Sequence, residues 1–259
     1  VAFLSAGVSA YRWRRGQHGD DVRIGLRTGV YLAAVLIPLQ IAIGDLHGLN
    51  TLEHQPAKVA AMEGLWETRS GAPMVVFALP DEASRSNRGE IAVPGLASLY
   101  LTHRWDGEVK GLDDFAHHPP VAPVFFAFRL MVGIGVLMLV VSWFAAWQMR
   151  RSTAPSPIVL RVLAAMSFAG WIALTAGWYV TEIGRQPWLV SGVLTTADAA
   201  SSIPSAMIAG TLAMYLVLYT VLVLAYVVVI FHLARKAGEP ARDGSTTPDA
   251  FHPEHLHHA

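Results

Sequence analysis

The chain has 259 residues, of which 53% are hydrophobic and 15% are charged, and its formal net charge at pH 7 is zero. Soluble domains carry about 25% charged residues, so the deficit here indicates a membrane protein. The balanced charge gives no electrostatic reason to expect nucleic-acid binding. The chain contains no cysteine, which excludes disulfides, iron–sulfur clusters and thiolate-held haem.

Long uncharged runs predict the membrane-spanning elements, because a helix needs roughly 20 apolar residues to cross a bilayer. The opening run at 1–11 is too short, and we interpret it as the end of a helix that starts before Val1. Four further runs are longer: Thr28–Gly44, Val121–Gln148, Val162–Thr181 and Ile203–Phe231. We therefore expect an all-α integral membrane protein, part of a helical bundle with four full transmembrane helices, the end of a fifth, and a large outer loop.

The distribution of basic residues predicts the orientation. Arginine and lysine gather in the first and third connections and after the last helix, whereas the second connection is acidic. Because cytoplasmic loops carry the excess of Lys and Arg, the second connection faces outward and the C-terminus faces the cytoplasm. Four parts result: the truncated helix and one full helix at 1–44, an outer loop at 45–120, three helices at 121–237, and a disordered cytoplasmic tail at 238–259.

Two charged residues are the main candidates for chemistry, because charge within a membrane span is costly. Arg129 lies near the outer end of its helix, two residues before Met131, and Glu182 closes the next helix. The spacing of Trp178, Glu182 and Arg185 places them on one face of a continuing helix. A carboxylate beside an indole and a guanidinium suits a haem iron and its propionates. An Arg–Glu pair that caps a helix end, with a methionine that only fills the core, explains the same residues.

The outer loop begins with a predicted short amphipathic helix, Pro56–Thr68, with proline in its first turn. Lys58 and Glu63 are opposite charges in its apolar part, and Trp66 follows one turn later. A quinol headgroup needs a hydrogen-bond donor, a proton acceptor and a flat apolar surface, which these side chains supply. Spacing alone favours a simpler interpretation, a surface helix that lies on the bilayer. We assign no firm structure to the rest of the loop.

Three segments together resemble subunit I of cytochrome bd-type quinol oxidases, in content and in order. GWYVTEIGRQPW at 177–188 is similar to the family's segment near the high-spin haems, and FFAFRLMV at 125–132 to the segment with its low-spin haem ligand. GDLHG at 44–48, followed by QPAKVAAMEGLWET at 55–68, is similar to the start of the quinol-binding loop. The Gly-Arg-Gln-Pro-Trp element is highly specific, and the resemblance covers most of the chain.

The resemblance implies roles around haem for five residues. Met131 matches the axial ligand of the low-spin haem b, and Arg129 matches an arginine close to that haem. Glu182 matches the carboxylate that ligates the high-spin haem b, and Trp178 and Arg185 match residues packed around the haems. The implied cofactors are therefore a low-spin haem b, a high-spin haem b, and haem d or a third haem b.

The resemblance also implies a reaction and its partners. Lys58 and Glu63 match the pair implicated in quinol oxidation, with Asp45 at the loop entrance. Ubiquinol or menaquinol would be oxidised at the outer face, and electrons would pass through the haems to molecular oxygen, which is reduced to water. The family works with a partner, subunit II, in the bacterial cytoplasmic (inner) membrane, as a multi-pass protein with residues 45–120 outside.

The alternatives come from other classes of membrane protein. In a transporter, Arg129 and Glu182 would line a substrate path, and polar residues would lie deep in broken spans. A small haem-carrying anchor would show histidine pairs within its spans, and the predicted spans contain none. If the oxidase interpretation holds, the first helices and their histidine ligands lie upstream of Val1, and we expect this fragment alone to be inactive.

Overall fold

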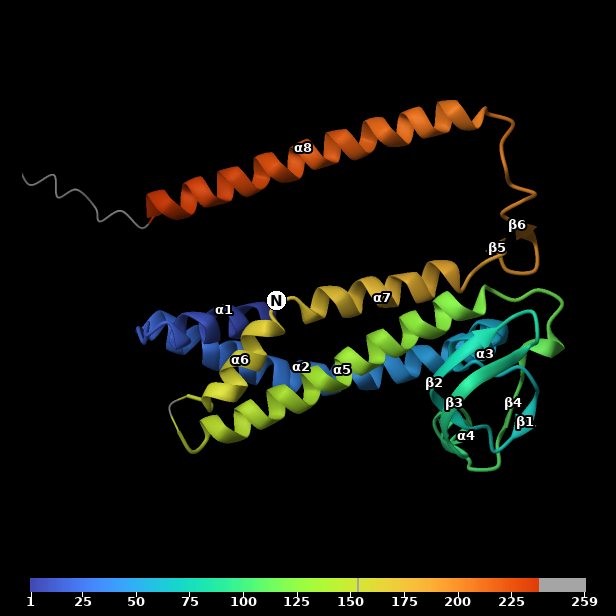
Figure 1. Ribbon diagram of the computed structural model, residues 1–259, viewed down its shortest axis with the longest axis horizontal. Helices are drawn as coiled ribbons and strands as arrows, with labels where there is room; N and C mark the ends of the chain where they lie inside the picture. Colours follow the sequence, from blue (N-terminus) through green and yellow to red (C-terminus); the bar gives the residue numbers. More distant parts are fainter. Residues whose placement is uncertain (153, 238–259) are drawn as a thin grey trace, which may run out of the picture. The chain divides into compact units, whose positions relative to one another are not determined.

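The computed structural model describes residues 1–152 and 154–237 (Figure 1). The chain divides into two units, Val1–Ala200 and the part from Ser201 onward, and each is described by itself. The predicted tail at 238–259 lies outside the described residues. In the first unit the helices that pack together are α1 (Ala2–Arg14), α2 (Asp20–His54), α5 (Val121–Met149), α6 (Pro157–Ala165) and α7 (Ala169–Ile183).

The described helices confirm a mostly helical protein with three to four candidate membrane spans. By length and composition α2, α5 and α8 (Ser205–Ala237) can each cross a bilayer. The predicted span Val162–Thr181 is two helices, α6 and α7, that meet at 41° and count as a fourth crossing if taken together. The 13-residue α1 is about 20 Å long, which is less than the roughly 30 Å of a hydrocarbon core.

Close helix contacts form the core of this bundle. Phe3, Leu26, Val30 and Leu163 are buried in one cluster shared by α1, α2 and α6. At Gly29 a Cβ atom would lie 2.6 Å from the Ala6 backbone nitrogen, so only glycine permits this approach. Packing of this kind suits membrane helices, where small residues let backbones come together.

A proline in α2 does not end the helix. Pro38 cannot donate to the carbonyl four residues earlier, that of Ala34. The Trp143 indole Nε1 of α5 donates to that carbonyl oxygen at 2.9 Å. The neighbouring helix therefore satisfies the polar group that proline leaves free, which is how prolines are tolerated in membrane helices.

The helix α2 carries the chain well beyond the predicted boundary at Gly44. Its 35 residues extend about 52 Å, so Asp45 is helical and the helix ends only at His54. Helix α3 (Pro56–Glu63) follows with Pro56 in its first turn. The predicted helix over 56–68 is thus confirmed for its first eight residues. It ends early because Gly64 adopts φ +67°, the left-handed conformation that terminates helices.

The region between α3 and α5, for which we predicted no firm structure, is ordered; we call it the outer region, after the side of the membrane that the charge distribution predicts for it. Figure 1 shows it gathered at the end of the bundle where α2 ends and α5 begins. Val59, Leu65, Ala97 and Leu101 form its buried core. Its elements are the antiparallel hairpin of β2 (Met74–Asp81) and β3 (Ser86–Val93), the pair of β1 (Arg69–Ser70) and β4 (Glu108–Val109), helix α4 (Leu96–Thr102) and a 3-10 turn at Leu112–Asp114.

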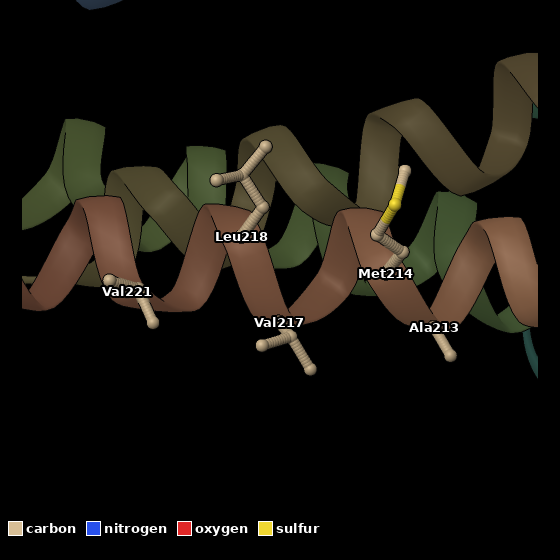
Figure 2. A pocket seen from close by; sticks show the side chains of 5 residues that line it. All are labelled: Ala213, Met214, Val217, Leu218 and Val221. Atoms are coloured by element: carbon tan, nitrogen blue, oxygen red, sulfur yellow. The ribbon is translucent and has the colours of Figure 1, made fainter.

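After α7 a short hairpin of β5 (Trp188–Val190) and β6 (Leu194–Thr195) completes the first unit. The second unit is the helix α8, whose described side chains are apolar and exposed along most of its length. Figure 2 shows a shallow hollow on α8 itself, lined by Ala213, Met214, Val217, Leu218 and Val221. Four of these side chains are aliphatic and the fifth is a methionine, so the hollow offers no group that donates or accepts a proton.

Candidate functional site

Arg129 of α5 binds the outer region. Its Nε donates to the Val75 carbonyl of β2 at 2.9 Å, and Nη2 donates to the same oxygen at 2.5 Å. Nη1 donates to the Met62 carbonyl, and Nη2 lies 3.4 Å from Glu63 Oε2. The guanidinium also lies over the Phe125 ring, 3.8 Å from its centroid. Arg129 therefore joins α5 to the end of α3 and to the hairpin.

Glu63 is the buried partner in this arrangement, with only 1% of its surface exposed. Burial raises the pKa of its carboxyl group, while the Arg129 charge and the Tyr100 hydroxyl of α4 lower it. Burial and the neighbouring Glu63 charge raise the pKa of Tyr100 as well. We call Met62, Glu63, Val75, Tyr100 and Arg129 the closed cluster, because its polar groups are bonded to one another and shielded from water.

Lys58 lies on a different face of α3 from Glu63. Five residues separate them, which corresponds to about 140° around a helix. The Lys58 side chain packs on Gly184, just after α7, where a Cβ atom would lie 3.0 Å from Lys58 Cγ. Burial, and then the Arg185 charge, lower the pKa of the Lys58 amine, and Glu182 raises it. The two residues predicted to act together on quinol thus have separate surroundings.

Glu182 and Arg185 form the ion pair that their spacing suggests. Arg185 Nη2 lies 2.5 Å from Glu182 Oε2, and both side chains are nearly half exposed. Trp178, one turn earlier, is 64% exposed. The helix α7 ends at Ile183, so Arg185 already belongs to the segment that follows. Arg129 and Glu182 make separate contacts, Arg129 with the end of α3 and with β2, and Glu182 with Arg185.

Met131 points toward α7. Its Sδ would lie 2.8 Å from a Cβ atom at Gly177, so the thioether rests directly on this glycine, next to Trp178. At Gly135, one turn after Met131 on the same face of α5, a Cβ atom would have open space around it. A thioether is a known haem ligand. The thioether and the space beside it therefore fit a haem, although Arg129 and Met131 point to different neighbours.

A cleft of about 290 Å³ lies at the end of the first unit where α2 meets α3. Three chain segments form it: the junction of α2 and α3, the approach to α5, and the segment after α7. The His117 ring meets the Trp188 ring edge-on, with 5.6 Å between centroids. We call it the open cleft; the residues of its wall that bear on function are His54, Lys58, Phe115, His117, Arg185 and Trp188.

Sequence reasoning found only part of this cleft. Lys58 and Arg185 were predicted site residues, and the structure brings them to one wall. His54 and Trp188 were missed, although His54 directly precedes the Gln-Pro-Ala-Lys segment and Trp188 closes the Gly-Arg-Gln-Pro-Trp element. His117 had no signal in its local sequence. The predicted partner of Lys58, Glu63, belongs to the closed cluster and does not line the cleft.

The membrane-length helices and the outer region define a class of protein, a multi-pass helical membrane protein with an ordered region over one end of the bundle. The family model described as cytochrome bd terminal oxidase subunit I matches residues 1–238. The chain belongs to this family.

Individual relatives agree with the family match. The chain is 34% identical over 215 residues to cytochrome bd ubiquinol oxidase subunit 1 of Bacillus subtilis (strain 168), covering 77% of this chain and 46% of the relative. It is 27% identical to cytochrome bd-II ubiquinol oxidase subunit 1 of Escherichia coli (strain K12), and the match covers 90% of this chain and 59% of the relative. The bd oxidase structure from Geobacillus thermodenitrificans matches with a TM-score of 0.80 at 30% identity, and the match covers 91% of this chain and 54% of the chain in that structure. The chain therefore spans about half the length of these relatives.

Proposed function

We propose that this chain serves within subunit I of a terminal respiratory quinol oxidase, which oxidises ubiquinol or menaquinol at the outer face and reduces oxygen to water. The observation that carries the proposal is the open cleft. It places the cations Lys58 and Arg185 beside the aromatic rings of Phe115 and Trp188, next to the helix that carries Glu182. Relatives named as ubiquinol oxidases support the substrate class.

In the cleft the side chains bind and orient the headgroup. Trp188 and Phe115 offer flat apolar surfaces to a quinol ring. Lys58 is buried and carries three donors, so its amine suits a hydroxyl oxygen that is losing its proton. Arg185 adds a second positive charge and is held in place by Glu182. Both cations favour a negative charge on the bound oxygen.

Five residues would surround the haems. Met131 would hold the iron of a low-spin haem b with Arg129 nearby, and Glu182 would hold that of a high-spin haem b, with Trp178 and Arg185 beside it. When bound, the haems, including haem d or a third haem b, would accept single electrons and pass them to oxygen. The chain's own part is to supply the thioether and the carboxylate, and to keep the outer region closed over them through Arg129.

The activity belongs to the assembly, because the chain spans about half the length of its relatives. We propose that it works with subunit II in the bacterial cytoplasmic membrane. Residues 45–120 would lie outside and the C-terminus in the cytoplasm, so that substrate protons leave on the outer side.

The test uses membranes that contain the full-length subunit with its partner. A reduced-minus-oxidised spectrum should show haem b bands, and quinol should drive oxygen uptake. Met131→Leu should abolish the low-spin haem signal, whereas Met138→Leu, on the same helix but packed in the bundle core, should keep it. Absence of haem bands, or oxygen uptake that is indifferent to quinol, contradicts the proposal.

A further inference from the structure

The hairpin of β2 and β3 is apolar both where it packs and where it is exposed. Against α5, Val75, Ala78 and Phe125 are buried together. The hairpin also carries five large apolar side chains that are between 44% and 63% exposed, which we call the hairpin patch: Val76, Phe77, Leu79, Ile91 and Val93. An antiparallel pair that packs on one side normally carries polar residues on the other. The hairpin patch therefore calls for an apolar neighbour.

We propose that the hairpin patch lies in the bilayer, at the boundary between the headgroups and the acyl chains of the outer leaflet. Its partner is thus a lipid surface, which apolar faces of peripheral elements enter by about 5–10 Å. The proposal goes beyond the reaction and does not depend on it, since it requires only that α5 crosses the membrane. It is carried by the position of the hairpin along α5, by the length of α5, and by the order of polar and apolar residues in the hairpin.

The hairpin lies beside the first nine residues of α5. Glu82 Oε1, at the turn, accepts a hydrogen bond from the Val121 backbone nitrogen at 2.8 Å. The rings of Phe77 and Phe126 lie 6.5 Å apart between centroids. Arg129 binds a backbone oxygen near the start of β2. The turn of the hairpin is therefore level with the first residue of α5, and its open end is level with the third turn.

The length of α5 places these nine residues above the hydrocarbon core. Its 29 residues extend about 43 Å, whereas the core is about 30 Å thick. Arg150 and Arg151 directly follow the helix, and such basic residues mark the cytoplasmic boundary. About 20 residues counted back from there reach Leu130, at the outer surface of the core. Residues 121–129, and the hairpin beside them, then pass through the outer headgroup region.

The hairpin patch continues the exposed apolar surface of α5. Phe126 and Leu130 lie one turn apart on one face of the helix and are 40% and 49% exposed. Phe126 contacts Phe77, which pairs with Ile91 across the hairpin. The surface that a membrane helix presents thus extends without a polar break onto both strands.

Polarity in the hairpin changes with the expected depth. Strand β2 is apolar over 74–80 and ends on Asp81, and β3 is polar over 86–90 and apolar over 91–93. The polar part contains the turn and is level with the start of α5, farthest from the core. The apolar part is level with the residues next to the core. Contact with a second protein surface requires no such order, whereas a bilayer imposes it.

The experiment places a nitroxide label at three points of the hairpin in the complete oxidase, held in lipid nanodiscs. The variants are Ser84→Cys at the turn, which serves as the control, Ile91→Cys in the hairpin patch, and Val93→Cys at the open end. This chain has no cysteine, and those elsewhere in the complex are replaced. Oxygen concentrates among acyl chains and a nickel chelate stays in water. The ratio of their collision rates with the label should rise from 84 to 91 to 93, and should be several times higher at 93 than at 84.

Two results would overturn the proposal. Collisions with the nickel chelate at Ile91 as frequent as those at Ser84 would show that the hairpin patch faces water. Few collisions with either reagent at Ile91 would show that protein covers it, whether the rest of the subunit, the partner subunit or a second copy. An unfolding temperature close to that of the unaltered complex shows that each labelled variant is intact. If Ile91→Cys does not fold, Phe77→Cys, its cross-strand neighbour, gives the same test.

Discussion

The two charged residues of α3 lie in regions with opposite properties. In the closed cluster, Glu63 is bonded to Arg129 and hidden from water. In the open cleft, Lys58 shares a wall with exposed histidines and aromatic rings. The same eight-residue helix therefore presents one charge to the closed cluster and one to the open cleft. Two charged residues five positions apart on one short helix can thus have different surroundings, one inside the protein and one at the wall of a cleft.

The largest effect should come from breaking the closed cluster. Arg129→Ala leaves the Glu63 carboxylate buried without a partner, and removing one member of a buried pair costs about 3–5 kcal/mol. Thermal unfolding of the purified complex should show this loss, with faster proteolysis within 64–120. Adding Glu63→Gln should recover part of the stability, because the uncompensated charge is then gone. A free energy of unfolding within about 1 kcal/mol of that of the unaltered complex would mean that the cluster is not closed in the protein.

Substitutions in the wall of the open cleft should change the kinetics of quinol oxidation and leave stability nearly unchanged. Lys58→Met keeps an apolar stem of similar length but removes the cation from the cleft wall. We expect the KM for quinol to rise about tenfold, equivalent to roughly 1.4 kcal/mol of binding, with a small change in kcat. Steady-state oxygen uptake at varied quinol measures both. Lys110→Met, an exposed lysine of the outer region, is the control, and equal KM values in the two variants would refute a role for Lys58 in binding.

The pH dependence of stability distinguishes the closed cluster from the open cleft further. Burial raises the pKa of Glu63 above its ordinary value, so the folded state holds this proton more tightly than the unfolded chain. The free energy of unfolding should therefore fall as the pH rises from the ordinary carboxyl pKa through the raised one. Glu63→Gln removes this titration. Thermal unfolding of both proteins across that range should show the unaltered protein losing stability relative to the variant, and a relative gain would mean that Arg129 dominates over burial.

The smallest effect is expected at the exposed ion pair. Arg185→Ala breaks the contact with Glu182, in which both side chains are nearly half exposed. Such pairs contribute about 0–1 kcal/mol, so unfolding should hardly move. Quinol turnover should nevertheless fall, because Arg185 is part of the cleft wall. A loss of stability as large as that of Arg129→Ala would erase the distinction between the two regions.

The apolar runs predicted the helices, because a helix that crosses a bilayer needs about 20 consecutive apolar residues and such runs are visible in the sequence. The ion pair of Glu182 and Arg185 was also predictable, since a spacing of three residues on a helix fixes it. The break between α6 and α7 could not be predicted, because the apolar stretch around Ser167 carries neither proline nor charge. The hairpin of β2 and β3 could not be predicted either, because so short an apolar run fits a helix, a strand or a loop.

The candidate site was predictable only in part, for the same kind of reason. Local motifs identified Lys58 and Arg185 singly. Their meeting with each other and with His117 depends on contacts between segments more than 50 residues apart in sequence, and no local spacing encodes those. The contact of Arg129 with Val75 is a similar case, because the two residues are 54 positions apart in sequence. The sequence revealed a costly charge in a membrane helix but not the carbonyl oxygen that it binds.

Labelling with a photoreactive quinone tests the open cleft as the quinol site most directly. The complete oxidase would be illuminated with the probe and its labelled peptides mapped by mass spectrometry, with and without excess quinol. The account predicts label that quinol displaces, confined to the three cleft segments at 54–58, 115–119 and 184–192. Displaceable label on the hairpin of β2 and β3, or at the closed cluster around Glu63, would contradict it.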